Sequence, residues 1–433
     1  MNKASGNYRW TICALMFAAT TINYMDRQVI ALLKPYLTTD LHWDSGDYAN
    51  IEIAFKITYA IGMIGAGRVI DKLGTKLGYG IFAGLWSLAA VLHAFVSSTL
   101  GFSFARAFLG ITEAGNFPAA IKTTAEWFPK KERALATGIF NSGSNVGAII
   151  APLSVPFIAE KYSWQTAFLL TGAIGFVWLI FWFMIYQPPS QHKKLSAGEF
   201  DYIHSDKDEA AESANDGPPF TWRQLLKYKQ TWAFVAGKFL TDPIWWFYLF
   251  WLPDFLNKQY GLTSVQVAFP IALVYIMSSV GSVGGGWLPF YLIRKERSVF
   301  WARKTSMLIY ALLVLPIVFA QYLGAINMWL AIITVGFAAA AHQAWSANIF
   351  TTVSDMFPKR AVATVTGIGG MAGGIGGILL SLLVQKRMFV YYEKLNQLPK
   401  AYFIMFLICG LAYISAWAIM FSLIKSKKEI TAP

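Results

Sequence analysis

The stretch Asn23-Tyr24-Met25-Asp26-Arg27-Gln28 sets an acid beside a base inside a segment, 10–33, that otherwise reads as membrane-spanning. A charge in the hydrocarbon core costs several kcal/mol, about 2.5–3.5 on insertion scales. Charged residues persist there mainly where they face the interior of a helix bundle or a water-filled cavity. The pair therefore predicts a functional site inside a membrane protein, and the rest of the chain indicates which kind.

The composition is that of a membrane protein along the whole chain. Of the 433 residues, 56% are hydrophobic and 14% are charged, whereas a soluble domain carries about 25% charged residues. The net charge of +13 comes from basic residues in short loops and follows the positive-inside rule, so we expect no nucleic-acid partner. The cysteines, Cys13 and Cys409, lie far apart in apolar segments. We expect no disulfide, metal or cofactor.

Apolar runs of about 20 residues recur from end to end, as transmembrane helices require. Six are predicted on each side of a polar segment: 10–33, 48–69, 77–96, 99–122, 135–158 and 165–186, then 231–256, 265–292, 304–322, 326–350, 362–385 and 400–424. We divide the chain into an N-terminal six-helix bundle (1–187), a cytoplasmic linker (188–230) and a C-terminal six-helix bundle (231–433). The predicted fold is thus an all-α integral membrane protein whose repeats pack around a midplane cavity.

Basic residues predict the orientation of the chain. They follow the second, fourth and eighth predicted spans, which places those loops on the cytoplasmic side. With twelve spans, both termini are then cytoplasmic. The residues concerned are Arg68, Lys72, Lys76, Lys130, Lys131, Arg133, Arg294, Lys295, Arg297, Arg303 and Lys304.

The exit of the second span reads Gly67-x-x-x-Asp71-Lys72-x-Gly74-x-Lys76. Its glycines permit tight turning and close helix approach. Asp71 and the basic residues can pair with helix ends across a cytoplasmic gate, as a breakable latch. In a twelve-helix chain this pattern resembles the helix 2–3 loop of the major facilitator superfamily.

Polar residues recur at helical spacings inside the spans. Arg106 and Glu113 are two turns apart, so they share one helix face about 10 Å apart along the axis. Asn116 follows three residues later on the same face, and we expect Arg106 to be the resting partner of Glu113. The other such positions are Asn23, Asp26, Arg27, Glu52, Lys56, Tyr59, Lys238, Asp242, His342, Gln343, Trp345, Ser346 and Asn348.

Three of these groups also have a purely structural interpretation. Glu52 and Lys56 can form a solvated ion pair near the outer end of their helix. Lys238 and Asp242, four residues apart, can neutralise each other without touching a substrate. His342 can be a packed polar residue.

A mechanism follows from the charges. A fixed cation such as Arg27 or Arg106 can hold a substrate carboxylate through a bidentate pair. A buried acid beside it can switch between two forms, because burial favours the neutral form and a neighbouring arginine favours the charged form. Protonating Asp26 or Glu113 would then free the cation for the anion, which couples proton entry to anion entry. Hydroxyl recognition and stacking would come from Tyr24, Tyr59, Asn116, Gln343 and Asn348.

Longer motifs carry a closer resemblance, which covers nearly the whole chain. Three features resemble the anion:cation symporter branch of that superfamily: Tyr24-x-Asp26-Arg27, Arg106 with Glu113, and Glu126-Trp127-Phe128-Pro129-x-x-Glu132-Arg133. Three others are most similar to bacterial hexuronate transporters: Ser142-Gly143-Ser144-x-x-Gly147-Ala148-x-Ile150-Ala151-Pro152, Ala341-His342-Gln343-Ala344 and Ser354-Asp355-x-Phe357.

The resemblance implies roles by position. Asp26 and Glu113 match the branch's proton-coupling acids, Arg27 matches its anchor for the substrate carboxylate, and Arg106 matches the arginine that communicates with Glu113. The full set of expected substrate-binding residues is Arg27, Tyr24, Tyr59, Lys56, Arg106, Asn116, Ser144, Lys238, His342, Gln343, Trp345 and Asn348.

The expected function is proton-coupled import of a sugar acid, foremost glucuronate or galacturonate, by alternating access across a bacterial inner membrane. The protein would act as a monomer in the lipid bilayer, with the anion and protons as its partners. The alternatives are import of galactonate, glucarate or an aromatic acid, and efflux of a drug or metabolite. Ser144 lies where galactonate transporters carry a glutamine, which weighs against galactonate. No nucleophile–base, metal-ligand or phosphate-loop pattern indicates an enzyme.

Overall fold

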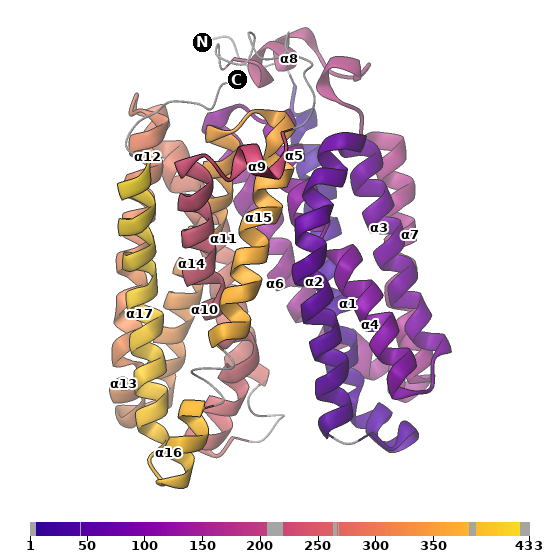
Figure 1. The fold of residues 1–433 in the computed structure, drawn as a ribbon, viewed down its shortest axis with the longest axis vertical. Helices are drawn as coiled ribbons and strands as arrows, with labels where there is room; N and C mark the ends of the chain where they lie inside the picture. Colours follow the sequence, from indigo (N-terminus) through magenta and orange to yellow (C-terminus); the bar gives the residue numbers. More distant parts are fainter. Residues whose placement is uncertain are drawn as a thin grey trace. The chain divides into compact units, whose positions relative to one another are not determined.

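The fold is described from a computed structural model of the chain. It describes residues 6–43, 45–205, 220–262, 266, 268–380 and 387–424, so the middle of the predicted linker, 206–219, lies outside them. Regular structure in the described residues is helical (Figure 1). The chain forms two compact units. The first holds residues up to Trp222 together with Val353–Ile368, and the second holds Arg223–Thr352 and Gly369–Lys428. The division of the chain at 187 and 231 stays a prediction.

The first unit is built mainly from seven helices and a short one from the predicted linker. They are α1 (Tyr8–Leu41), α2 (Ser45–Leu73), α3 (Thr75–Leu92), α4 (Thr99–Glu113), α5 (Asn116–Trp127), α6 (Lys130–Lys161), α7 (Trp164–Ile185) and α8 (Ala197–Ile203). Helix α1 packs on α6, α2 packs on α4, and α3 runs beside α7 (Figure 1).

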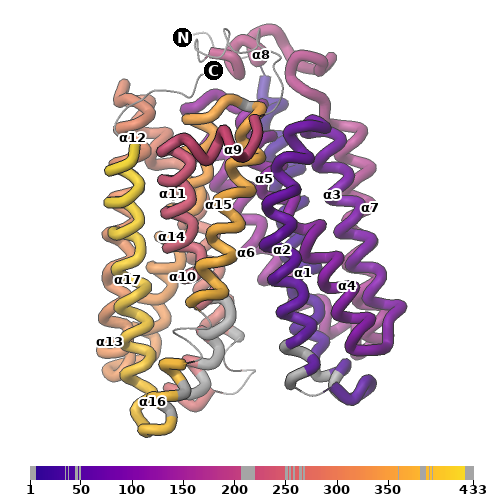
Figure 2. Tube along the Cα trace, viewed as in Figure 1, coloured from indigo at the N-terminus to yellow at the C-terminus, as the bar shows by residue number. Residues whose placement is uncertain are grey.

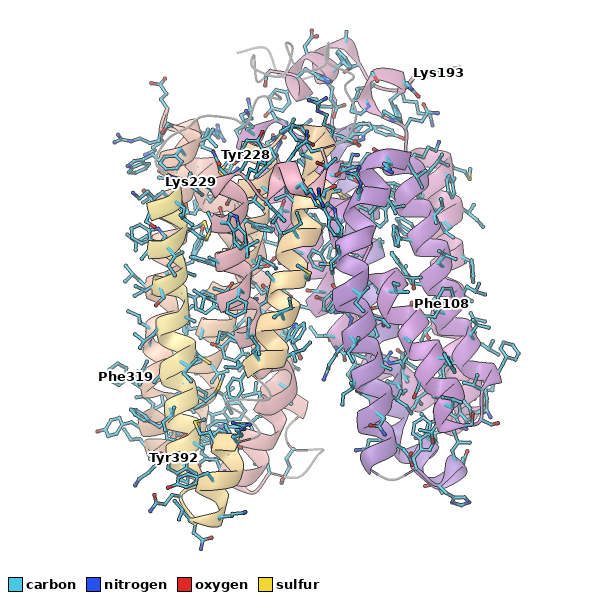
Figure 3. The ribbon with its side chains drawn as sticks, in the orientation of Figure 1. Phe108, Lys193, Tyr228, Lys229, Phe319 and Tyr392 are labelled. Carbon is cyan, nitrogen blue, oxygen red and sulfur yellow. The ribbon has the colours of Figure 1, made fainter. Side chains whose placement is uncertain are left out.

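From α9 (Trp222–Leu225) onward most of the chain belongs to the second unit. Its helices are α10 (Lys229–Tyr260), α11 (Ala268–Arg294), α12 (Val299–Val314), α13 (Ala320–Ile326), α14 (Met328–Met356), α15 (Lys359–Leu379), α16 (Val390–Lys394) and α17 (Leu398–Leu423). The end of α14 and the start of α15 belong to the first unit. Figure 3 shows Phe319 directed away from the helices of the second unit, and it is 61% exposed, as suits a side chain that faces lipid.

Glycines allow the helices that carry the charges to approach closely. A Cβ added to Gly143 of α6 would stand 2.5 Å from the Phe17 carbonyl of α1. One added to Gly110 of α4 would stand 2.5 Å from the Phe55 carbonyl of α2. Only glycine fits where backbones pack this tightly. These contacts hold α1 and α2 against the helices opposite them.

The predicted span 99–122 is wrong as a single helix, because it is split into α4 and α5. Helix α4 ends at Glu113, and two turn residues precede Asn116. Pro118 has no N–H to donate to the Ala114 carbonyl, four residues before it, and Gly115 leaves room for the Phe82 ring, which an added Cβ would strike. The break places Glu113 at the end of a helix.

Nine of the helical segments in the described residues are long and apolar enough to cross a membrane. The predicted spans missing from this set are the first, fourth and seventh. They carry Asp26 with Arg27, Arg106 with Glu113, and Lys238 with Asp242. The second span adds Glu52 and Lys56 to these charged residues, and a charge inside a span typically faces the bundle interior or a water-filled cavity.

Helix α8 from the predicted linker is bound to the start of α1. Glu199 accepts hydrogen bonds from the backbone N–H groups of Tyr8 and Arg9, each at 3.1 Å, and pairs with the Arg9 guanidinium at 3.1 Å. Arg9 also pairs with Glu132 of α6 at 2.8 Å, and the Tyr202 hydroxyl donates to Glu132 at 2.8 Å. A carboxylate here satisfies donors that a helix start leaves unpaired and complements the helix dipole.

Replacing Glu199 with Gln is expected to lower the free energy of unfolding by about 2 kcal/mol, because hydrogen bonds to a charged group would be weakened. Glu160→Gln is the matched control, since Glu160 is exposed at the end of α6. Thermal unfolding of the purified proteins checks this. Equal melting temperatures for the two variants would contradict the role of Glu199.

Candidate functional site

An ion pair between α1 and α4 lies at the centre of the candidate site. The Arg27 Nε donates to Glu113 Oε2 at 2.9 Å. The Glu113 side chain is 0% exposed, whereas that of Arg27 is 17% exposed. The base of the pair therefore keeps an open side that a small anion can approach, while the acid is enclosed by the helices.

Aromatic rings surround the Arg27 guanidinium. Its central carbon lies 4.6 Å from the centre of the Tyr24 ring, 4.8 Å from Tyr59 and 5.3 Å from Phe55. Ring faces attract a cation, so these residues hold the guanidinium in place independently of Glu113. Tyr24 and Tyr59 were expected in the site. Phe55 was missed, although it precedes Tyr59 by one helical turn on the same face of α2.

Arg106 does not rest on Glu113, so that prediction was wrong. The Arg106 Nη2 pairs with Glu52 of α2 at 2.8 Å and donates to the Arg27 carbonyl at 2.9 Å. Arg106 and Glu113 are two turns apart on α4, and they pair with different helices. Arg106 pairs with Glu52 of α2, and Glu113 pairs with Arg27 of α1. Glu52 therefore belongs to this network, and Lys56 lies partly buried one turn further along α2.

Asp26 lies on another side of α1 from Arg27, as expected for adjacent helical residues. It is 2% exposed and lies near Thr171 of α7, without a hydrogen bond of normal geometry from the described residues. Glu113 and Arg106 are close enough for their charges to act on it. A charged carboxylate without donors is costly to bury, so this position suits a carboxyl group that carries a proton.

Asn116 and Ser144 are engaged away from Arg27. Asn116 accepts a hydrogen bond from the Tyr79 hydroxyl at 2.7 Å and donates to Thr20 Oγ1 at 3.4 Å. The break between α4 and α5 removes the helix face that Asn116 was predicted to share with Glu113. Ser144 donates to the Asn141 carbonyl of its own helix at 2.7 Å. Their roles in substrate binding stay predictions.

The second unit contains its own buried ion pair. Lys238 Nζ lies 2.7 Å from Asp242 Oδ2, one turn further along α10. The ammonium group also lies 4.1 Å from the centre of the Phe350 ring of α14. The spacing of four residues allows this ion pair, and the structure contains it; the role of Lys238 in substrate binding stays a prediction.

His342 of α14 is packed between aromatic residues of the second unit. The Trp245 ring stacks on it at 5.0 Å, and its Nδ1 lies 2.6 Å from the Tyr413 hydroxyl. Trp345 packs edge-on against Tyr413.

Asn348 donates to the carbonyls of Gly285 and Ala344, and its side-chain oxygen is buried without a donor in the described residues. Gln343 is buried on the same helix. No signal in the sequence identified Tyr413.

The predicted gate residue Asp71 is fully engaged within the first unit. One oxygen pairs with Lys122 at 3.0 Å, and the other accepts hydrogen bonds from the Thr364 N–H at 2.8 Å and hydroxyl at 2.6 Å.

The other predicted gate residues lie around Asp71 along the chain. Gly67 lies against the Ala363 backbone, where a side chain does not fit. Gly74 has a positive φ of 79°, which glycine adopts without strain. Lys72 is exposed and Lys76 is partly buried. Their roles as a gate stay predictions.

Comparison with known proteins agrees with this fold. The model of the Major Facilitator Superfamily matches residues 16–381. The chain is 33% identical over 386 residues to the hexuronate transporter of Escherichia coli (strain K12), covering 89% of this chain and 88% of that protein. It is 37% identical over 281 residues to the galacturonate transporter of Dickeya chrysanthemi, covering 65% of this chain and 81% of that protein.

Among solved structures, the proton:xylose symporter XylE superposes with a TM-score of 0.77 at 16% identity, covering 98% of this chain and 97% of that chain. This likeness shows the fold. The predicted all-α membrane class is confirmed, and so is the expectation that the protein is a transporter and not an enzyme. The chain belongs to the Major Facilitator Superfamily of multi-pass membrane transporters.

Proposed function

We propose that this protein is a proton-coupled symporter that imports a sugar acid, foremost a hexuronate such as glucuronate or galacturonate, by alternating access. The ion pair of Arg27 with Glu113 carries the proposal. Arg27 is the group that can bind the substrate carboxylate, because a guanidinium matches a carboxylate in geometry and charge. Relatives named for hexuronate and galacturonate transport support the substrate class.

Competition for Arg27 provides the coupling in this proposal. While Glu113 is charged, it occupies Arg27 Nε. When Glu113 takes a proton, its hold on the guanidinium weakens and a substrate carboxylate can replace it. The aromatic rings keep Arg27 in place during the exchange. Asp26, buried beside this pair, is the second proposed proton carrier.

The protein would lie in a bacterial inner membrane as a monomer, with both termini in the cytoplasm. Asp71 and Lys122, with Thr364, would form the cytoplasmic gate.

The second candidate function is import of another sugar acid, since the chain is also 30% identical to a D-galactonate transporter.

A binding screen tests the proposal. Purified full-length protein is heated with glucuronate, galacturonate, galactonate, glucarate or an aromatic acid, at pH values on either side of neutrality. A bound ligand at about 100 times its Kd stabilises the folded state by about 2.7 kcal/mol. We expect the largest rise in melting temperature with a hexuronate, and a larger rise at the lower pH.

Glucose and galactose are the matched controls, because they carry a hydroxymethyl group where the hexuronates carry the carboxylate. Equal stabilisation by the neutral sugars would contradict recognition through Arg27. A larger shift with galactonate than with either hexuronate would favour the second candidate.

A further inference from the structure

The break between α4 and α5 is held on both sides by other helices of the first unit. Helix α4 ends at Glu113, and α5 begins three residues later at Asn116. On the α4 side, Glu113 pairs with Arg27 of α1 at 2.9 Å. On the α5 side, Asn116 contacts α1 and α3. All four helices belong to the first unit (Figure 2).

Asn116 joins the start of α5 to two neighbouring helices. Its side-chain oxygen accepts a hydrogen bond from the Tyr79 hydroxyl of α3 at 2.7 Å, and its amide group donates to Thr20 Oγ1 of α1 at 3.4 Å. All three residues are 0% exposed. Breaking a buried hydrogen bond leaves its donor and acceptor unsatisfied. These contacts therefore fix the start of α5 relative to α1 and α3.

Helix α3 also packs against the break itself. Phe82 lies against Gly115, where an added Cβ would stand 2.3 Å from the ring. Tyr79 and Phe82 are three residues apart and share a helix face, so one face of α3 contacts both Gly115 and Asn116. The Tyr79 ring packs edge-on against Trp182 of α7 at 4.9 Å, which keeps its hydroxyl in place.

Helix α1 contacts this short segment twice. Thr20 and Arg27 are seven residues apart, or two turns, so they share one face of α1 about 10 Å apart along its axis. Thr20 contacts the segment through Asn116, and Arg27 contacts it through Glu113. Because three residues separate these two contacts along the chain, a shift at Asn116 would also move Glu113 relative to Arg27.

We propose that Asn116 and Tyr79 are positioning residues for the proton-coupling carboxylate. By fixing the start of α5, they hold Glu113 at the end of α4 against Arg27. This inference rests on the proposed function, in which charged Glu113 competes with the substrate carboxylate for Arg27. It gives Asn116 a role in coupling in place of the predicted contact with the substrate.

A substitution of Tyr79 leaves the charged groups around Glu113 unchanged. Within the part of the chain that the structure describes, these groups are Arg27 and Asp26 of α1, Arg106 of α4 and Glu52 of α2. Tyr79→Phe removes one hydroxyl group and keeps the ring. A change in how strongly Glu113 holds Arg27 in this variant therefore reflects position and not charge.

The test measures the Kd of glucuronate at one pH below neutrality and one above it, by titration of purified full-length wild type and Tyr79→Phe. At the higher pH, Tyr79→Phe is expected to bind at least about threefold more tightly, or roughly 0.65 kcal/mol. The reason is that a displaced Glu113 competes less well for Arg27. At the lower pH, where Glu113 carries a proton, the two proteins should bind equally. Asn116→Ala should behave like Tyr79→Phe.

Tyr186→Phe is the matched control. Tyr186 is also 0% exposed, its ring stacks on Trp182 at 4.2 Å, and its hydroxyl donates to Glu126 at 2.5 Å. The control therefore removes a buried hydroxyl from the same aromatic cluster without touching Asn116. It should change the melting temperature and leave the pH dependence of Kd as in the wild type. A purely structural role of Tyr79 predicts the same result for Tyr79→Phe.

A second measurement needs no ligand. The interaction energy between Arg27 and Glu113 is obtained from the unfolding of the wild type, Arg27→Ala, Glu113→Gln and the double variant, as a double-mutant cycle. The interaction energy should be smaller when all four proteins also carry Tyr79→Phe. Equal interaction energies in the two backgrounds overturn the inference.

The two measurements also separate this inference from the proposed function. If wild-type affinity weakens at the higher pH and folded Tyr79→Phe shows the same Kd values as the wild type, the inference fails and the proposed function stands. Wild-type affinity that does not depend on pH contradicts the proposed coupling itself. In that case the unfolding cycle still decides whether Tyr79 positions Glu113 against Arg27.

Discussion

Arg27→Ala is expected to abolish detectable binding of a hexuronate, with a loss of affinity of at least about 100-fold, or about 2.7 kcal/mol. In the proposed mechanism the substrate carboxylate replaces Glu113 on this guanidinium. Arg106, the next arginine in this network, is held through its Nη2 by Glu52 and by the Arg27 carbonyl. Titration of purified protein with glucuronate and galacturonate checks the loss.

The variant also leaves the fully buried Glu113 without its partner. Removing one member of a buried ion pair typically costs about 3–5 kcal/mol. The double variant Arg27→Ala/Glu113→Gln removes that cost, so it should be more stable than Arg27→Ala and still fail to bind. Arg223→Ala, at an exposed position on α9, is the matched control and should bind normally. Unchanged affinity in the double variant would rule out Arg27 as the anchor.

Glu113→Gln is expected to abolish accumulation of the substrate against its gradient while exchange of labelled for unlabelled substrate continues. A glutamine cannot carry a proton through the cycle, so transport loses its driving force. It also leaves Arg27 without a competing charge, so substrate affinity should be equal to or higher than that of the wild type. Uptake and exchange in proteoliposomes, with and without an imposed proton gradient, separate these effects.

The pH dependence of substrate affinity gives a second measure of the role of Glu113. Wild-type affinity should weaken as pH rises, because charged Glu113 then holds Arg27, and Glu113→Gln should weaken much less. Glu52→Gln makes the same substitution in the neighbouring pair with Arg106 and should retain proton-driven accumulation. Accumulation by Glu113→Gln at the wild-type level would show that the proton is carried elsewhere.

The sequence by itself determined the class of protein and the helices that carry its charges. Repeated apolar runs can satisfy their backbone hydrogen bonds in a membrane only as helices. The polar positions 26, 27, 106, 113, 238 and 242 follow directly from the chain. Where partners lie one turn apart on one helix, as with Lys238 and Asp242, the 3.6-residue period also determined the contact.

Only the tertiary structure decided which charges meet between helices. Arg27 and Glu113 are 86 residues apart, and Arg106 and Glu52 are 54 apart. Helical period places side chains on a face, but it does not set the level at which another helix crosses that face. Here close contacts at glycines and the end of α4 at Glu113 determine where along each helix its neighbour packs. The same holds for Glu199, which lies 190 residues from Arg9. The candidate site thus depends on packing between distant segments, which a single sequence does not encode in any local pattern.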